Sequence, residues 1–246
     1  MKTILILHGD TPAGQAAIEA AENRNLKILA VSRAPMTRRQ FKKVQWFHID
    51  TSDHDHVEQL ASQLDREKTA VDILLTCPFS VFVSDGSAPD FFDEKAIDSW
   101  DRIIRHNLRS VMLFCKVFGK RMSTRCQGRI IQLLSNVSID PHDPRHFKKG
   151  DCPSAAYTAA MGAIQALSRH LAAQYQDNGV LINNIIYGPL SESEPRDLVE
   201  SYAHRVPMGR VMTIKDLANT IDLLLDPHSS YITGQNIMAD GGVAIW

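Results

Sequence analysis

The sequence predicts an α/β fold: a single Rossmann-like, doubly wound parallel sheet with helices on both faces. Short runs rich in β-branched residues alternate with longer amphipathic stretches along the whole chain. The short runs are continuously apolar, as expected of strands that a parallel sheet buries on both faces. In such a sheet ligands bind at the carboxyl ends of the strands, so functional residues are expected there.

Seven runs are expected to be strands and five longer stretches to be helices. The expected strands are 3–7, 27–31, 46–49, 73–75, 129–134, 181–186 and 237–238. The expected helices are about 12–23, 53–66, 97–122, 155–176 and 214–225. No linker, repeat or low-complexity tract interrupts this alternation, so residues 1–246 are expected to form one domain.

Two segments break the alternation and are expected to be loops. Residues 139–153 carry three prolines and several charges between a strand and a helix. Residues 190–208 follow a Gly188-Pro189 turn and are rich in Ser, Glu, Pro and Arg. Loops of this length in a compact domain are often functional lids, and a surface insertion is the alternative.

The composition is that of an ordinary globular protein. Hydrophobic residues make up 44% and charged residues 22%, with a formal net charge of -1. This balance gives no reason to expect a nucleic-acid partner. Four scattered cysteines without a C-x-x-C pair fit a reducing cytoplasm, and the apolar run 3–7 is too short to be a signal or membrane segment. We therefore expect a cytoplasmic protein without membrane association.

Three histidines near the end of the third expected strand raise the question of a metal site. His48, His54 and His56 lie among aspartates. Neither their spacing nor their ligand type selects a particular metal, so no metal is predicted. A polar loop between a strand and a helix explains the cluster.

Four segments, in order along the chain, resemble the classical short-chain dehydrogenase/reductases (SDRs). Residues 100–108 are similar to the family's W-D-x-x-x-x-x-N-L helix, and residues 128–135 to its G-R-I-x-x-x-x-S strand. Residues 183–189 are similar to N-x-x-x-P-G-P, with Tyr187 in place of the first proline. Residues 230–235 and 240–242 are similar to the family's T-G and D-G-G end. The resemblance spans essentially the whole chain and implies the doubly wound fold.

The resemblance also implies a reaction, hydride transfer between NAD(P)H and a carbonyl or alcohol, and the residues for it. Tyr157 occupies the place of the catalytic tyrosine, Ser135 that of the substrate-holding serine and Asn107 that of the relay asparagine. Met161 stands where the family has a lysine that lowers the tyrosine pKa and holds the nicotinamide ribose. Holding a tyrosine near pKa 7 instead of 10 requires ~4 kcal/mol. Its loss costs about a thousandfold in the reactive population.

Each of these residues also has a purely structural interpretation. Tyr157 and Met161 share one helix face and suit packing in a buried core. Asn107 suits a bridge between backbone groups, and Ser135 suits the end of a strand.

The expected phosphate loop, residues 8–15, departs from the family's T-G-x-x-x-G-x-G. Gly9 keeps the tight turn after the strand, but ungapped matching places Ala13 and Gln15 at the other two glycine positions, with Gly14 displaced by one. Those glycines normally let backbone approach the pyrophosphate and let helix pack on strand. Thr11 as helix cap, followed by Pro12, still predicts a helix start whose amides could bind an anion.

The other positions expected to contact a cofactor include some that favour binding and some that oppose it. Phe79 replaces a family glycine after the fourth expected strand, where it fills a vacated cavity or walls a pocket. Arg33, followed by Arg38, Arg39, Lys42 and Lys43, suits a 2′-phosphate or a solvated helix face. Asp50 is expected either at the adenine or as a cap of the next helix, and Gly188 is carried over with the 183–189 segment. Together these predict no cofactor, or weak NADP(H) binding.

Three hypotheses follow from the loss of cofactor contacts at Gln15, Phe79 and Met161. The first is a catalytically inactive subunit that joins a homo- or hetero-oligomer through helices 97–122 and 155–176, with an active SDR paralogue as the partner. The second is an enzyme that uses Ser135, Tyr157 and Asn107 for NADPH-dependent carbonyl reduction or redox-free acid–base chemistry. In it His146, Lys148 or Lys149 supplies the missing charge. The third is a protein that binds a small molecule in the cleft without catalysis.

Overall fold

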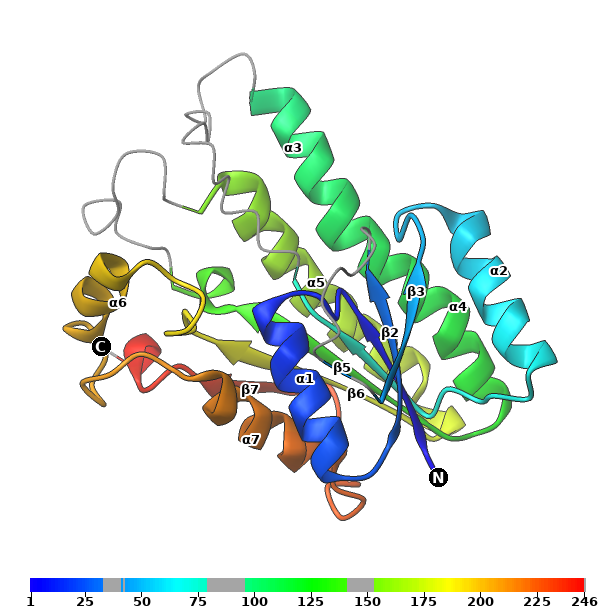
Figure 1. The fold of residues 1–246 in the computed structure, drawn as a ribbon. Helices are drawn as coiled ribbons and strands as arrows, with labels where there is room; N and C mark the ends of the chain where they lie inside the picture. The colour runs from blue at the N-terminus through cyan, green and yellow to red at the C-terminus, as the bar shows by residue number, and fades with distance from the viewer. Residues whose placement is uncertain (33–40, 42, 79–95, 141–152, 246) are drawn as a thin grey trace.

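The computed structural model describes residues 1–32, 41, 43–78, 96–140 and 153–245. Within them, seven parallel strands form one sheet in the order β3-β2-β1-β4-β5-β6-β7 (Figure 1). The strands are β1 (Thr3–Leu7), β2 (Lys27–Ser32), β3 (Val44–His48), β4 (Ile73–Thr76), β5 (Gly128–Ser135), β6 (Val180–Tyr187) and β7 (Asn236–Ala239). The order reverses between β1 and β4, which defines a doubly wound sheet and confirms the predicted fold class. All seven expected strands exist, with ends that differ by one or two residues.

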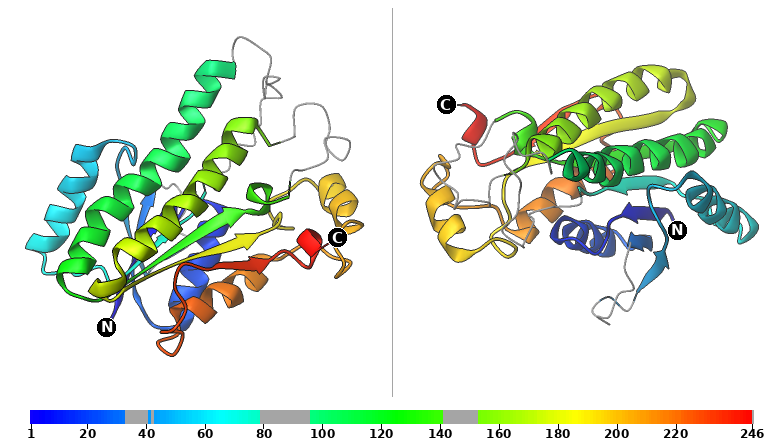
Figure 2. Two further views of the ribbon diagram at one scale, coloured as in Figure 1. Left: turned by 180° about the vertical axis from the view of Figure 1, so that it is seen from behind. Right: turned by 90° about the horizontal axis from the view of Figure 1, so that it is seen from above.

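Helices cover both faces of the sheet and enclose two separate cores. On one face lie α1 (Pro12–Asn23) and α7 (Ile214–Leu225), over a core that includes Ile4, Ile6 and Ile185. The opposite face carries α2 (His54–Arg66), α4 (Ser110–Thr124) and α5 (Ala155–Gln174), as Figure 2 shows from behind and from above. α3 (Ala96–Ile104) leads into α4 and lies beside α5. The strand ends between these layers are therefore the place for a site.

Three helix predictions need correction. The expected helix 97–122 is interrupted by a π-helical turn, η1 (Arg105–Arg109), between α3 and α4. The expected helix 155–176 ends at Gln174, and a short 3-10 turn, η4 (Gln176–Asn178), follows it. The expected loop 190–208 contains a further helix, α6 (Arg196–Ala203).

The helix α6 is held in place by a small core of its own. Tyr202, Val206, Val211 and Val243 are buried together, and the Asn136 side-chain amide donates a hydrogen bond to the Tyr202 hydroxyl at 2.6 Å. The helix has only eight residues and begins at Pro195 without a side-chain cap. Its apolar periodicity is therefore too short to stand out from the surrounding polar sequence.

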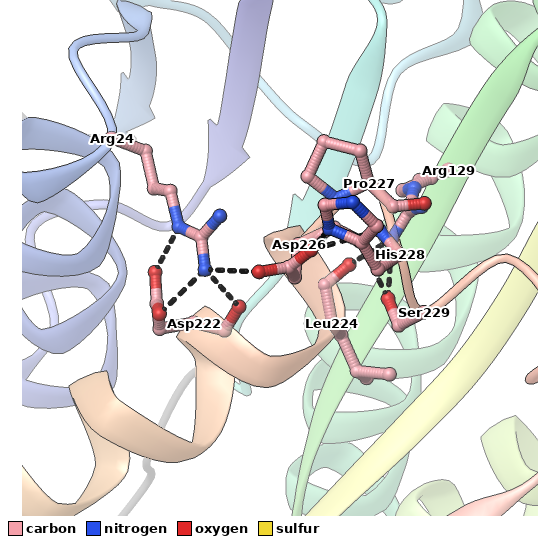
Figure 3. Close-up of polar contacts among 8 residues, drawn as sticks. All are labelled: Arg24, Arg129, Asp222, Leu224, Asp226, Pro227, His228 and Ser229. Atoms are coloured by element: carbon pink, nitrogen blue, oxygen red, sulfur yellow. Dashed lines mark hydrogen bonds and ion pairs between the residues drawn. The ribbon is translucent and has the colours of Figure 1, made fainter.

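An ion-pair cluster joins the first and last helices at the edge of the α1–α7 layer (Figure 3). The Arg24 guanidinium donates to both carboxylate oxygens of Asp222, at 2.5 and 2.7 Å, and to Asp226 at 2.9 Å. Asp226 also accepts from the backbone and ring nitrogens of His228. These donors, with the His228 backbone amide first, hold the pKa of Asp226 below its ordinary value.

We expect this cluster to make stability acid-sensitive. The pKa of Asp226 is lower in the folded state than in the unfolded chain, so its stabilising effect is present above about pH 4 and is lost as pH falls further. Asp226→Asn is expected to lower the urea midpoint of unfolding at pH 7 and to lower it by less at pH 2, where part of the stabilisation is already lost. Asp177→Asn, at a surface carboxylate on η4, is the matched control and should leave both midpoints unchanged. An equal loss at both pH values would contradict this explanation.

Candidate active site

The carboxyl ends of three neighbouring strands bring polar side chains together. Cys77 follows β4, Ser135 ends β5 and Tyr187 ends β6. Ser135 and Tyr187 are direct partners in the β5–β6 register. Neighbouring strands lie about 4.8 Å apart, so these side chains belong to one site. The expected position of the functional residues at the strand ends is thus occupied by polar groups.

Tyr157 lies on the first turn of α5, facing this site. The helix begins at Ser154, whose hydroxyl accepts a hydrogen bond from the Tyr157 backbone amide at 3.2 Å. The Tyr157 side chain is 9% exposed, and burial raises the pKa of its hydroxyl. A hydrogen-bonding interaction with Ser135 acts in the opposite direction but is the smaller effect. The structure therefore brings Ser135 and Tyr157 together, as the resemblance implies, but keeps the phenol protonated.

Met161 lies one helical turn after Tyr157 and is completely buried. It is 0% exposed and belongs to the core between the sheet and the helices α2, α4 and α5. None of the described cations influences the pKa of Tyr157. The packing interpretation of Met161 therefore describes its surroundings correctly, and position 161 offers no charge to the phenol.

Asn107 occupies the π-helical turn rather than a regular helix. It is 1% exposed, and its side-chain amide donates to the Ile103 carbonyl at 3.2 Å. A π-turn leaves backbone groups out of the regular i to i−4 pattern and is frequent at functional sites. Asn107 thus bonds the backbone one turn before it, within a local irregularity that the sequence does not predict.

The loop after β1 is better preserved than the sequence suggests. Thr11 caps α1, accepting from the Gly14 amide at 3.0 Å and donating to the His8 carbonyl at 2.9 Å, and Pro12 opens the helix. A Cβ atom added to Gly14 would lie 2.6 Å from the backbone of Gly9. Gly14 therefore keeps helix and loop in close contact, although it is displaced by one from the family's glycine position.

This contact predicts opposite effects of alanine at two helix glycines. Gly14→Ala is expected to lower the free energy of unfolding by about 1–3 kcal/mol, because backbone must shift to admit the methyl group. Gly162→Ala on α5 meets nothing within 4 Å and should raise it by about 0.5–1 kcal/mol through helix propensity. Urea unfolding of both variants tests the pair. Equal effects would contradict the close contact between Gly14 and Gly9.

His8, at the family's threonine position, is a buried polar residue in an unusual conformation. Its φ angle is 56°, in the left-handed region that non-glycine residues rarely adopt. Its Nδ1 lies 3.0 Å from the Cys77 carbonyl, and because a carbonyl only accepts, Nδ1 carries a proton. Nε2 lies 3.3 Å from the Thr51 hydroxyl, which in turn meets Ser110 at 3.1 Å. His8 thereby ties the loop after β1 to the end of β4 and the start of α4.

A glutamate that the sequence did not single out, Glu194, influences the tyrosines of this site through its charge. Glu194 follows β6 in a loop whose preceding residues are held by backbone hydrogen bonds, from the Ser191 amide to the Met212 carbonyl at 2.8 Å and from the Ser193 amide to the Leu190 carbonyl at 3.0 Å. Its charge raises the pKa of both Tyr157 and Tyr187. Burial raises the pKa of Glu194 itself to about 7. The loop 190–208 has no sequence pattern that marks this residue.

Tyr187 is the second site residue without a functional prediction. It is 9% exposed, lies in the core on the α1–α7 side, and none of the described residues forms a hydrogen bond with its hydroxyl. Burial is the largest cause of its raised pKa, and electrostatic interactions with Tyr157, Cys77 and Glu194 raise the pKa further. Its place in the family's proline position was the signal available in the sequence. The described part of the site is thus a group of weak acids.

The remaining predicted contacts are not gathered at this site. Asp50 accepts from the amide and hydroxyl of Ser52, at 2.9 and 2.6 Å, and pairs with Arg105 at 3.5 Å. Asp53 caps α2, so the prediction of Asp50 as that cap is wrong. At Gly188 an added Cβ would keep ordinary distances of 3.9 Å, so packing does not require glycine there.

Several predictions fall on residues outside the described part of the chain: Arg33, Arg38, Arg39, Lys42, Phe79, His146, Lys148 and Lys149. Among the described residues, no group of three or more His, Cys, Asp or Glu side chains is arranged to hold a metal ion. His48 meets the Ser32 hydroxyl at 2.8 Å, and His54 meets Asp55 at 3.4 Å. No helix in the described ranges is long and apolar enough to cross a membrane.

Comparison with known proteins identifies similar sequences over most of the chain. A family model described as enoyl-(acyl carrier protein) reductase matches residues 23–244. A Bacillus subtilis (strain 168) protein named uncharacterized oxidoreductase YxbG is 26% identical, covering 98% of this chain and 90% of that protein. Meso-2,3-butanediol dehydrogenase from Serratia marcescens is 29% identical, covering 79% of this chain and 73% of the enzyme.

Solved structures share the fold at lower identity. A short chain dehydrogenase from Leptospira borgpetersenii with bound NAD+ has a TM-score of 0.87 at 21% identity, covering 99% of this chain and 92% of that one. A gluconate 5-dehydrogenase from Burkholderia cenocepacia in complex with NADP and tartrate has a TM-score of 0.80 at 20% identity, covering 100% and 96%. At these identities the likeness concerns the fold alone.

Proposed function

Because the chain belongs to the short-chain dehydrogenase/reductase family, we propose that it is a member that performs no NAD(P)-linked hydride transfer by itself. It supports a partner chain of the same family as a subunit of an oligomer. In this proposal it binds no cofactor, or NADP(H) only weakly.

The observation that carries this proposal is the environment of Met161. The position is fully enclosed in an apolar core one turn from Tyr157, whose pKa is raised by burial. Lowering that pKa to near 7 would take ~4 kcal/mol of favourable interaction with the phenolate. A thioether supplies none of it, because it has neither charge nor donor.

The end of β6 adds support for a weakened cofactor site. Tyr187 replaces the family's proline and buries its ring on the side of the sheet that carries α1, in the same core as Ala13 and Cys77. These three residues come from segments where the resemblance places the cofactor. A large ring among them occupies volume that a bound dinucleotide needs.

The partner surface in this proposal is the outer side of α3 and α5. Along α5, exposed small residues recur on one face at Ala155, Ala159 and Ala166, with open space beside Gly162. On the neighbouring α3, Ile97 is 70% and Trp100 38% exposed. Small side chains let a second helix pair approach closely, and exposed apolar groups gain from being covered. A chain of the same fold presents a matching pair of helices.

The experiment is co-expression with an SDR chain from the same genome that retains the catalytic lysine. The two chains are expected to co-purify, and Ala159→Arg should separate them, since a long charged side chain enters the contact. Gln59→Arg, on α2 away from this surface, adds the same charge and should leave the complex intact. If the chain is monomeric both alone and after co-expression, and Ala159→Arg changes nothing, the supporting role is contradicted.

A second candidate is a redox-free acid–base enzyme, favoured by the retained approach of Ser135 to Tyr157. Two hydroxyls at one point can hold a carbonyl oxygen without any nucleotide. For such an enzyme Tyr157→Ala would abolish turnover, whereas a protein that merely binds a small molecule in the cleft would keep most of its affinity.

A further inference from the structure

The helix α6 belongs to a segment, residues 191–211, whose two ends are joined to each other. Leu190, after β6, forms a parallel bridge with Met212, before α7. The Ser191 amide donates to the Met212 carbonyl at 2.8 Å and closes the base of the segment. The segment leaves this point, passes beyond the carboxyl ends of β5 and β6, and returns to it (Figures 1 and 2). A segment joined at its base can move as one body about that point.

Tyr202 of α6 fastens the segment to the strand ends. It is 2% exposed, and its hydroxyl accepts a hydrogen bond from the Asn136 side-chain amide at 2.6 Å. Asn136 directly follows Ser135, the last residue of β5. A Cβ atom at Gly188, which directly follows β6, would lie 3.9 Å from both the ring and the hydroxyl of Tyr202. The phenol of Tyr202 therefore contacts the ends of both strands of the candidate site.

Two further polar contacts hold the segment against the rest of the chain. The Arg205 guanidinium lies 3.6 Å from the Asp140 carboxylate, and both side chains are about a quarter exposed, at 24% and 25%. Water screens an ion pair at that exposure, so it adds little stability. The Met208 amide donates to the Gly241 carbonyl at 3.3 Å. The hydrogen bond of Tyr202 is shorter and more deeply buried than either of these contacts.

The closed position of the segment leaves a polar atom unpaired. The side-chain oxygen of Asn136 is buried, and no group among the described residues donates to it. A buried acceptor without a donor costs free energy, which water would restore if α6 moved away. Near the base, Gly209 has a φ angle of 68°, and an added Cβ atom would meet nothing within 4 Å. The segment thus combines a buried fastening, a cost of closure and an uncrowded left-handed glycine at which it can turn.

We propose that residues 191–211 form a lid that turns on the bridge between Leu190 and Met212, with the hydrogen bond between Tyr202 and Asn136 holding it shut. Opening uncovers the ends of β5 and β6, where a small molecule with a carbonyl or hydroxyl oxygen enters. With Tyr202 withdrawn, the Asn136 amide presents both a donor and an acceptor to such a molecule. This inference goes beyond the proposed function, because it concerns access to the cleft and does not depend on nucleotide binding.

Hydrogen exchange of the whole chain, measured by NMR without nucleotide, tests the role of Tyr202. Tyr202→Phe leaves the buried Asn136 donor unpaired, so the amides of α6 should exchange at least about fivefold faster than in the wild type. The Ser191 amide and the amides of α5 should keep their wild-type rates, because the base of the lid and the core stay closed. Tyr231→Phe, at a fully exposed tyrosine, makes the same chemical change and should alter nothing.

A thiol placed beside the Tyr202 ring measures access to the strand ends. Gly188 is buried, yet it has room for a Cβ atom, so Gly188→Cys should fold with its thiol covered by the lid. Peptide mass spectrometry after iodoacetamide treatment separates its labelling from that of the exposed Cys126. Adding Tyr202→Phe should raise the labelling rate at position 188 at least about fivefold and leave that of Cys126 unchanged.

Three results would overturn the proposal. The first is exchange of α6 at the wild-type rate in Tyr202→Phe. The second is equal acceleration of the Ser191 amide and α6, because the segment would then unfold together with its base. The third is labelling of Gly188→Cys as fast as Cys126 while Tyr202 is present, because the closed lid would then not cover the strand ends. Since no nucleotide is present, the proposed lack of hydride transfer is judged separately by NADPH binding.

Discussion

Met161→Lys, which restores the family's residue, is expected to destabilise the protein strongly rather than to activate it. Position 161 is 0% exposed within an apolar core, so a lysine there would be buried among apolar side chains. A lysine buried without a partner loses about 3 units of pKa. That corresponds to ~4 kcal/mol of unfolding free energy at neutral pH.

The pH dependence of that loss identifies its cause. The folded state would hold the lysine with a lowered pKa, so the unfolded chain binds more protons and stability rises as pH increases toward 10. Met161→Leu, which conserves volume, should cost less than about 1.5 kcal/mol. Ala173→Lys, at an exposed position of the same helix, should cost little. Urea unfolding at pH 7 and pH 10 measures all three, and a well-tolerated Met161→Lys at pH 7 would show that position 161 faces a solvated cleft.

Glu194→Gln is expected to stabilise the folded chain at alkaline pH alone. The pKa of Glu194 is raised from 4.5 to about 7 by burial, so the protonated form favours the folded state. Stability from this group is present below about pH 4.5 and is lost as pH rises through 7. The amide mimics the protonated acid, so the variant should exceed the wild type by at most ~3 kcal/mol at pH 9.

At pH 5 most of this difference should vanish, because the wild-type carboxyl group is then protonated in the folded state. Thermal or urea unfolding of the wild type, Glu194→Gln and Glu22→Gln at both pH values provides the comparison. Glu22→Gln should follow the wild type throughout. A stability gain of equal size at pH 5 and pH 9 would mean that Glu194 is not held in a protonation-sensitive environment.

The sheet was predictable because its signal is repeated along the chain. Strands such as β1 and β6 are continuously apolar, and a parallel sheet buried on both faces requires that pattern. The helix α1 was predictable residue for residue, since Thr11 and Pro12 mark its start. In contrast, α6 has eight residues and no side-chain cap, so nothing local distinguishes it from a loop.

The candidate site was predictable only where a residue occupies a motif. Ser135, Tyr157 and Met161 were found through the resemblance, and the structure places the first two together and the third in the core. Glu194 could not be found, because the loop that carries it is placed by the bridge between Leu190 and Met212, which are far apart in the sequence. The close contact of Gly14 with Gly9 is seen only in the structure, because sequence spacing does not reveal which Cα atom faces Gly9.

The most direct test of the proposed lack of independent hydride chemistry is a calorimetric titration of the purified chain with NADPH and then NADH. Oligomer size is measured in the same preparation, and an SDR with an intact lysine is titrated as the positive control. We expect no binding of NADH up to millimolar concentration, and none or only weak binding of NADPH. Binding at micromolar concentration would contradict the account, because it would mean that the site accommodates the dinucleotide despite Tyr187 and Met161.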